Sequence, residues 1–242
     1  MTRPGTLYGV SLGPGDPELI TRRAWSLLRR ADVYWTWPVR VAGGESFALG
    51  IALAAGLAPP ASSEPLLFPM TRDEARLAEA WQEAAQRVIA VLCQGRDVLF
   101  LVEGDASIYS SFGYLARTVR ALDAAIPIET VAGVTSFNAA AARVPVSLAD
   151  GDETVAILPA SPDLATVDRL LAELDSLVLL KVAPRLDALI DLLARHGRLD
   201  EAVLIEKTGT PEERIVPDLA SLRGVRVGYL SLVLVRRTAP AG

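Results

Sequence analysis

The fold is decided by the stretch Val98-Leu99-Phe100-Leu101-Val102-Glu103-Gly104-Asp105-Ala106-Ser107-Ile108-Tyr109-Ser110. Its first five residues are an unbroken apolar, β-prone run, which is typical of a strand buried on both faces of a parallel sheet. After the Glu-Gly-Asp turn, apolar residues recur at helical spacings of three and four: Tyr109, Phe112, Leu115, Ala116 and Val119. The stretch therefore predicts a strand, a turn and a helix, which is the repeating unit of an α/β fold.

The turn inside this unit is a predicted ligand site. Ligands of open α/β sheets bind beyond the carboxyl ends of the strands. Gly104 lets the main chain approach a ligand closely, Asp105 supplies a carboxylate, and the first N–H groups of the next helix supply donors. An ordinary turn with a capping aspartate and serine explains the same residues equally well, so other stretches must decide.

Composition narrows the class of protein. The chain has 242 residues, of which 51% are hydrophobic and 22% charged, as in a globular protein. No apolar run approaches the roughly 18 residues of a membrane span, and the amino terminus leads straight into a predicted strand, so we expect no signal peptide. Cys93 is the only cysteine, which excludes a disulfide framework and a thiolate metal cluster and leads us to expect a cytoplasmic protein. The net charge of −5 argues against a general nucleic-acid binder.

The single histidine is predicted to be structural. His196 precedes Gly197 at the end of a helical pattern, where glycine is the usual cap. A Ser-His-Asp mechanism or a multi-histidine metal site is therefore not expected, and we predict no metal.

Strands and helices alternate along the whole chain, which predicts two α/β domains. The expected strands or extended pieces lie at residues 7–12, 31–35, 66–71, 98–102, 128–131, 154–158, 177–182 and 202–206, with one or two more in 225–235. The expected helices lie at residues 18–28, 46–57, 72–94, 109–119, 137–142, 163–174 and 185–195. Proline, glycine and acidic residues replace periodicity at 143–153, so we divide the chain into domains 1–145 and 146–242.

Three turns in the first half share one design, an apolar strand followed by a glycine-bearing bend and a helix. They lie at residues 13–16, 104–105 and 133–136. None matches the dinucleotide motif G-x-G-x-x-G or a P-loop, and the proline of the first turn removes a main-chain donor. The turns can line one site if their strands are neighbours.

These motifs resemble those of a known family. The run Val10-Ser11-Leu12-Gly13-Pro14-Gly15-Asp16-Pro17-Glu18-Leu19-Ile20-Thr21 is similar to the amino-terminal signature of the tetrapyrrole methylases, S-adenosylmethionine-dependent enzymes of cobalamin and sirohaem synthesis. The central stretch resembles their second signature, and residues 206–210 and 229–233 also fit.

Within that family the chain resembles one branch most. Residues 68–71, 103–110 and 133–137 look most like the enzymes that methylate C20 of precorrin-2. Two departures are peripheral: Arg22 replaces a usually apolar residue, and Ala132 stands where a proline commonly precedes Gly133.

The resemblance implies a site as well as a fold. In the tetrapyrrole methylase fold the two α/β domains hold the methyl donor in the active-site cleft between them, and the donor-binding positions correspond here to Gly104, Asp105, Ile108, Thr135, Ser136, Val182, Thr208 and Ser231. Asp105 would pair with the donor's ammonium group, and Ile108 and Val182 would flank adenine. Without the resemblance, Val182, Thr208 and Ser231 would be interpreted as ordinary core or loop residues.

The tetrapyrrole is expected at the first turn. The resemblance assigns substrate binding to Gly13, Pro14, Gly15, Asp16 and Tyr109, and Asp16 is the candidate to accept or relay a proton. Asp16 as a helix cap and Tyr109 as a core aromatic are the alternatives. The carboxylates of the substrate would be met by arginines, for which we consider Arg22, Arg72 and Arg143, although exposed arginines on a solvated face are commoner.

The resemblance implies methylation of precorrin-2 at C20 to give precorrin-3A. The alternatives are the C20 methylation of cobalt-factor II, another tetrapyrrole methylase such as uroporphyrinogen III methyltransferase, and a non-catalytic tetrapyrrole- or nucleoside-binding protein. A homodimer is also implied, with neither a nucleic-acid nor a membrane partner.

Overall fold

A computed structural model describes residues 3–71, 73–160 and 164–237 of the chain. The chain separates into two compact units, Met1–Thr135 and Ser136–Gly242. The division lies at residue 135, whereas composition predicts residue 145. The reason is helix α5 (Ser136–Arg143), which packs against strand β10 (Ser231–Arg236) and so belongs to the second unit.

The first unit is built on a fully parallel five-stranded sheet in the order β3-β2-β4-β1-β5. Its strands are β1 (Leu7–Ser11), β2 (Tyr34–Val39), β3 (Glu64–Leu67), β4 (Val98–Val102) and β5 (Ile128–Val131). All residues of the central strand β4 are buried, as its apolar run predicts. Strand β2 extends beyond the predicted residues 31–35 because Thr36 to Val39 pair with β3 after Tyr34 to Thr36 have paired with β4.

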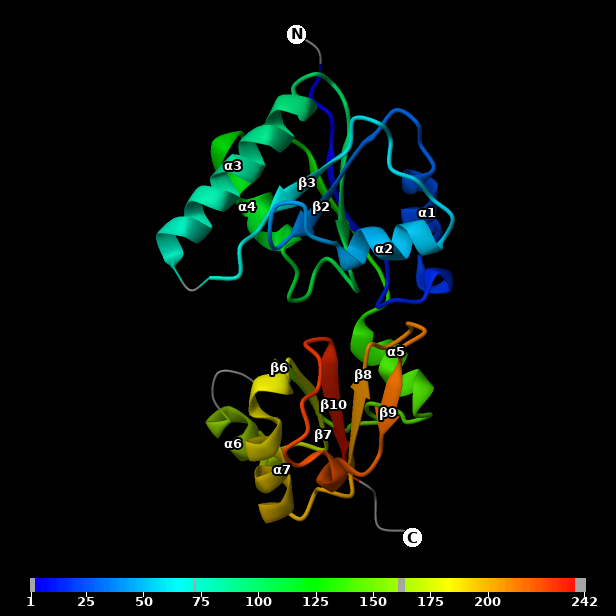
Figure 1. Ribbon diagram of the computed structural model, residues 1–242, viewed down its shortest axis with the longest axis vertical. Coiled ribbons are helices and arrows are strands. Elements are labelled where there is room, and N and C mark those ends of the chain that lie inside the picture. Colours follow the sequence, from blue (N-terminus) through cyan, green and yellow to red (C-terminus); the bar gives the residue numbers. More distant parts are fainter. Residues whose placement is uncertain (1–2, 72, 161–163, 238–242) are drawn as a thin grey trace. The chain divides into compact units, whose positions relative to one another are not determined.

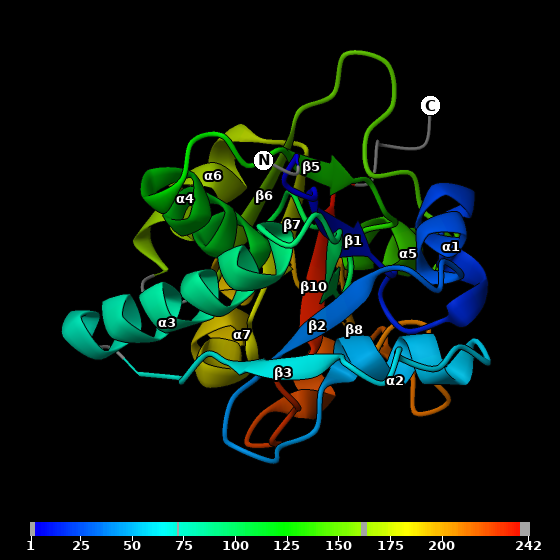
Figure 2. The same ribbon diagram turned by 90° about the horizontal axis from the view of Figure 1, so that it is seen from above.

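Helices cover both faces of this sheet. Helices α3 (Glu74–Leu92) and α4 (Phe112–Leu122) lie on one face, and α1 (Arg22–Leu28) and α2 (Phe47–Ala54) lie on the other (Figure 2). Each face has its own apolar cluster, centred on Phe100 toward α3 and α4 and on Trp35 toward α1 and α2.

Two predicted helices of this unit begin later than expected. The helix predicted at 18–28 is divided into a 3-10 turn, η1 (Pro17–Leu19), and α1, because Thr21 is extended and caps α1 by accepting a hydrogen bond from the N–H of Ala24 at 3.3 Å. Helix α4 begins at Phe112, so Tyr109 lies in the preceding turn and not on the helix.

The second unit contains a mixed five-stranded sheet in the order β6-β7-β10-β8-β9. The strands that precede β10 are β6 (Val155–Pro159), β7 (Ser176–Leu180), β8 (Ala202–Glu206) and β9 (Arg214–Val216). Strand β6 is parallel to β7, whereas β10 is antiparallel to both β7 and β8. The two α/β units confirm the predicted fold class.

Helices α6 (Ala165–Glu173) and α7 (Leu186–Arg195) pack on this sheet and supply much of its apolar cluster (Figure 1). His196 ends α7, as predicted, and its Nε2 atom lies 2.5 Å from Oδ1 of Asp168 on α6. In the part of the chain that the structure describes, no helix is both long enough and apolar enough to cross a membrane.

Candidate functional site

The three glycine-bearing turns of the first unit lie at one edge of its sheet. Strand β1 is placed between β4 and β5, and all three run in the same direction, so their carboxyl ends are neighbours. The turns after β1 and β4 also bond to each other through their main chains: the N–H of Gly13 donates to the carbonyl of Gly104 at 3.2 Å, and the N–H of Gly104 donates back at 2.7 Å. The strands that precede the three turns are therefore neighbours, which is what a shared site requires.

Asp105 joins the second and third turns. Its Oδ2 atom accepts a hydrogen bond from the N–H of Gly133 at 2.6 Å, and its Oδ1 atom accepts from the N–H of Ser107 at 2.8 Å and from the Ser107 hydroxyl. An ionised carboxylate offers about four acceptor positions, so these bonds leave about one for a ligand.

The environment of Asp105 favours its ionised form. The residue is 8% exposed, and burial by itself would raise the pKa of the carboxyl. The hydrogen bonds from Ser107 and Gly133 outweigh burial, so the pKa of Asp105 lies below its ordinary value. The group is therefore a fixed negative charge at neutral pH.

A buried serine connects the ends of β1 and β5 with the turn that follows β4. The hydroxyl of Ser11, at the end of β1, donates to the carbonyl of Val131 at 2.6 Å and accepts from the N–H of Ala106 at 2.8 Å. The sequence analysis did not select Ser11 as a site residue, because a single serine inside an apolar strand carries no signal of its own.

Gly133 is required by close packing. A Cβ atom at this position would lie 2.3 Å from Cβ of Ser11 and 2.8 Å from the carbonyl oxygen of Gly104. Both distances are far inside van der Waals contact, so only glycine lets the third turn approach the other two.

The Gly-Pro-Gly-Asp loop contains a helix cap. Oδ1 of Asp16 accepts a hydrogen bond from the N–H of Glu18 at 2.9 Å, which caps the 3-10 turn η1. The bond confirms the capping alternative and leaves Oδ2 without a hydrogen-bond partner among the described residues. Glu103, which is not a predicted site residue, supplies another carboxylate at this edge; the residue is exposed to solvent, yet the protein around it raises the pKa of its carboxyl through desolvation.

Tyr109 is not a core aromatic. Its side chain is 51% exposed and its φ is +50°, in the left-handed region. Ile108, next to it, is half-buried. Thr135 ends the first unit, and Ser136 begins α5 in the second.

Three predicted donor-site residues of the second unit also share one edge of a sheet. Strands β7 and β8 run in the same direction, since both are antiparallel to β10. Val182 lies two residues beyond β7, Thr208 lies two residues beyond β8, and Ser231 begins β10 opposite Glu206. All three side chains are buried. The Ser231 hydroxyl donates to the carbonyl of Gly228 at 2.7 Å.

Strained backbone marks both edges. Among the described non-glycine residues, only Tyr109, Lys181 and Lys207 have positive φ, at +50°, +56° and +51°. Each is directly beside a predicted donor-site residue, namely Ile108, Val182 or Thr208. Side chains in the left-handed region cost free energy and cluster at functional sites, so the strain supports these positions as a site.

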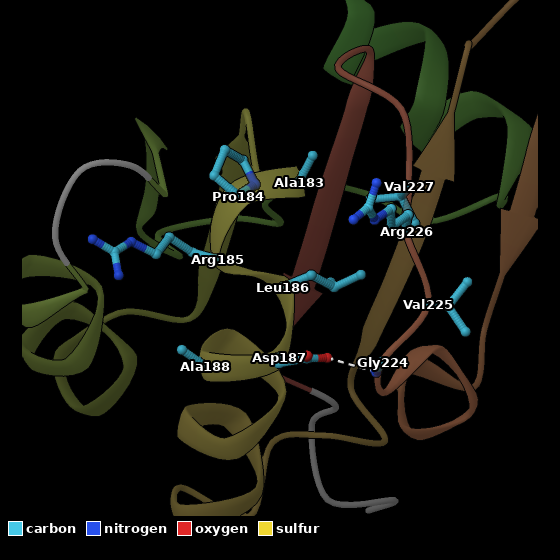
Figure 3. A pocket seen from close by; sticks show the side chains of 10 residues that line it. All are labelled: Ala183, Pro184, Arg185, Leu186, Asp187, Ala188, Gly224, Val225, Arg226 and Val227. Atoms are coloured by element: carbon cyan, nitrogen blue, oxygen red, sulfur yellow. Dashed lines mark hydrogen bonds between the residues drawn. The ribbon is translucent and has the colours of Figure 1, made fainter.

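A hollow of about 670 Å³ begins next to Val182. It is lined by residues 183–188 at the start of α7 and by residues 224–227, which approach β10. Leu186 points toward the second segment, whereas Arg185 points away from it (Figure 3). A hydrogen bond of 2.9 Å from the N–H of Gly224 to Oδ1 of Asp187 joins the two segments.

The three arginines considered for the substrate carboxylates have different environments. Arg22 begins α1 and is exposed. Arg143 ends α5, and its Nε atom donates to Glu213 at 2.7 Å. Arg72 lies outside the described residues.

Comparison with known proteins decides the family. Residues 6–222 match the family model for tetrapyrrole (corrin/porphyrin) methylases. The chain belongs to this family. As a tetrapyrrole methylase it carries the glycine-bearing turns described above within the matched region.

Curated relatives of this tetrapyrrole methylase span most of the chain. The cobalamin biosynthesis protein CobIJ of Mycobacterium tuberculosis is 35% identical over 97% of this chain, which spans only 46% of that protein. The precorrin-2 C(20)-methyltransferase of a Sinorhizobium species is 33% identical, covering 96% of this chain and 95% of the relative. The cobalt-precorrin-2 C(20)-methyltransferase of Salmonella typhimurium is also 33% identical, over 96% and 97%.

Solved structures show the same fold. The cobalt precorrin-4 methyltransferase CbiF superimposes with a TM-score of 0.71 at 22% identity, covering 96% of this chain and 94% of that one. A uroporphyrin-III C-methyltransferase of Thermus thermophilus, complexed with S-adenosylhomocysteine, gives a TM-score of 0.65 at 24% identity, covering 96% and 97%.

Proposed function

We propose that this chain is an S-adenosylmethionine-dependent methyltransferase that methylates C20 of precorrin-2 to give precorrin-3A, a step of corrin synthesis. The observation that carries the proposal is that strained, left-handed backbone lies next to predicted donor-binding residues in both units. Predicted donor positions gather at one sheet edge in each unit, and three of them, Ile108, Val182 and Thr208, lie directly beside the three left-handed residues. The names of two relatives that the chain covers almost completely support C20 as the position.

The residues present fit the methyl donor. Asp105 carries a negative charge with about one acceptor position left, which suits an ammonium group. Ile108 and Val182 offer apolar surface for adenine, and the main-chain groups around Thr208 offer polar partners for its edge. We propose that these residues contact the donor.

S-adenosylmethionine supplies a methyl group already activated on a sulfonium sulfur. The contribution of the chain is then alignment and proton handling. Holding two reactants in line is worth several kcal/mol, roughly 7–11 in the best intramolecular cases. The interlocked turns of the first unit provide a rigid surface on which such alignment depends.

Methylation at C20 also requires that this carbon lose a proton. Oδ2 of Asp16 is the proposed acceptor, because Oδ1 is already held by the N–H of Glu18. We assign Gly13, Pro14, Gly15 and Tyr109 to the tetrapyrrole surface, and Arg22 to a carboxylate of the substrate.

A second substrate is favoured to the same degree. The relatives named for precorrin-2 and for cobalt-precorrin-2 are equally identical to this chain. The alternative substrate therefore carries cobalt: cobalt-precorrin-2, for which that relative is named, or cobalt-factor II, with the same residues in the same roles. Uroporphyrinogen III methylation has weaker support, since the solved enzyme of that name shares the fold at only 24% identity.

The test is a paired assay with precorrin-2 and cobalt-factor II, each incubated with a donor carrying a labelled methyl group. Mass spectrometry and NMR of the product should show one label, at C20, with one of the two substrates. Labels at C2 and C7 of uroporphyrinogen III would support the alternative activity instead. The absence of label from every tetrapyrrole would overturn the proposal.

We further propose that the enzyme is a homodimer, which the resemblance implies, and that it is cytoplasmic, which its single cysteine favours. Light scattering during gel filtration should give twice the chain mass of 25.8 kDa. A mass of one chain at micromolar concentration would contradict the dimer.

A further inference from the structure

We infer that Ser11 is a positioning residue for methyl-donor binding: its buried hydroxyl fixes the turn after β4, where the donor is proposed to bind. The inference deepens the proposed function and rests on it. It assigns a role to a side chain that cannot touch the donor, since Ser11 is 0% exposed.

The hydroxyl of Ser11 makes two hydrogen bonds. A serine hydroxyl has one proton to donate and can accept in return. The proton of Ser11 goes to the carbonyl of Val131 at 2.6 Å, and its oxygen accepts the N–H of Ala106 at 2.8 Å. One atom therefore connects the ends of β1 and β5 with the turn that follows β4.

These bonds fix the turn at Ala106. Ala106 lies directly between Asp105, whose carboxylate holds Gly133, and Ser107, which donates back to that carboxylate. A shift of Ala106 would therefore move both the Asp105 carboxylate and Ile108, which are proposed donor contacts.

The packing around Ser11 leaves no alternative partner. Gly133 approaches so closely that a Cβ there would lie 2.3 Å from Cβ of Ser11. A water molecule has no space in which to replace the hydroxyl on that side. Removal of the hydroxyl therefore leaves the N–H of Ala106 buried and unpaired, unless the turn moves to satisfy it.

The test compares two buried serines. Ser11→Ala removes the connecting hydroxyl, whereas Ser176→Ala removes a hydroxyl that is also buried, at 1% exposure, but lies at the start of β7. That position is at the amino end of the strand, opposite the edge that holds Val182. Both variants are expected to lose stability, so the comparison separates positioning from stability.

Three measurements decide the outcome, all at a temperature where both variants are folded. The Kd for S-adenosylhomocysteine, from calorimetry, is expected to rise about tenfold in Ser11→Ala, the equivalent of leaving one buried polar group unpaired. The KM for S-adenosylmethionine should rise with it, while the KM for the tetrapyrrole stays unchanged. Hydrogen exchange at the Ala106 amide should become faster in Ser11→Ala and remain slow in Ser176→Ala.

An unchanged Kd for S-adenosylhomocysteine in folded Ser11→Ala would overturn the inference and leave the proposed function intact. A wild-type chain that does not bind S-adenosylhomocysteine would overturn the proposed function and the inference together. If Ser11→Ala does not fold, Ser11→Cys, whose thiol is a weaker donor and acceptor, serves in its place and should raise the same Kd to a smaller extent.

Discussion

The carboxylate of Asp105 accepts a hydrogen bond from the main-chain N–H of Gly133 at 2.6 Å. The two residues follow strands β4 and β5, which are not neighbours in the sheet, because β1 lies between them. Asp105 therefore spans the end of β1 and holds together two turns that no strand pairing connects. Its first role is structural, and its remaining acceptor position is what a ligand can use.

Asp105→Asn is expected to weaken both stability and donor binding. The amide NH₂ group faces a donor wherever it is placed, so either Gly133 or Ser107 loses its acceptor. Because a hydrogen bond to a charged group contributes about 1.5–3 kcal/mol, the free energy of unfolding should fall by about that amount. Asp123→Asn is the matched control, since the carboxylate of Asp123 makes only a local bond among the described residues, to the N–H of Ala125. Equal losses in the two variants would contradict the bridging role.

The stability contribution of Asp105 should depend on pH in one direction. Its pKa is lowered on folding, because hydrogen bonds from Ser107 and Gly133 outweigh burial. The ionised form is thus the stabilising one. The stabilisation by Asp105 is complete when the pH is above 3.8, the ordinary pKa of aspartate. It is lost as the pH falls through the lower pKa of the folded state. The difference in unfolding free energy between wild type and Asp105→Asn, from urea titrations, should be constant above about pH 5 and shrink below about pH 4. A difference that grows toward acid pH would refute the assignment.

Gly133→Ala should be far more damaging than an alanine elsewhere in the same unit. The new Cβ would lie 2.3 Å from Cβ of Ser11 and 2.8 Å from the carbonyl oxygen of Gly104, so strand ends must separate. We expect a loss of about 3 kcal/mol or more, the upper end of overpacking costs. Gly113→Ala, inside helix α4 with its nearest atom 3.5 Å away, should instead gain about 0.5–1 kcal/mol. Thermal unfolding of both variants checks the contrast. A Gly133→Ala variant that unfolds at the same temperature as the wild type would contradict the prediction.

Local pattern predicts the elements where apolar runs are long and bounded. Strands β5 and β8 have the expected bounds, and β4 has the expected burial. Strand β9 and the 3-10 turn η3 (Leu219–Leu222) were not predicted. In β9 the apolar Ile215 is exposed, and three residues are too few to carry a periodic signal.

The site is predictable only in part for a related reason. The positions of the turns follow from the strand and helix patterns that flank them. Their contacts depend on strand order, and chain order does not reveal that β1 lies between β4 and β5. The roles of Ser11 and Gly133 arise entirely from that placement.

Lys207 tests whether the left-handed backbone beside the predicted donor residues is strained. Its φ is +51°, which costs a side chain roughly 1–2 kcal/mol, whereas glycine avoids this cost but loses about 0.5–1 kcal/mol of chain entropy. Lys207→Gly should therefore be as stable as wild type or up to about 1 kcal/mol more stable, and Lys207→Val should be less stable than either. Arg226→Gly, at an exposed position without positive φ, is the control and should lose stability. Chemical denaturation of all three variants provides the comparison, and a loss in Lys207→Gly equal to that in Arg226→Gly would contradict strain.

Asp16→Asn separates the two roles of Asp16. Asparagine is as good a helix cap as aspartate, so the bond from the N–H of Glu18 and the stability should be retained. Asparagine cannot accept a proton, so kcat should fall by about 10²-fold or more if Oδ2 receives the proton from C20. Binding of the tetrapyrrole, measured by its absorbance change, should be unaffected. Glu103→Gln is the matched variant, since Glu103 is another carboxylate at this edge. A kcat that falls in Glu103→Gln but not in Asp16→Asn would transfer the role of proton acceptor to Glu103.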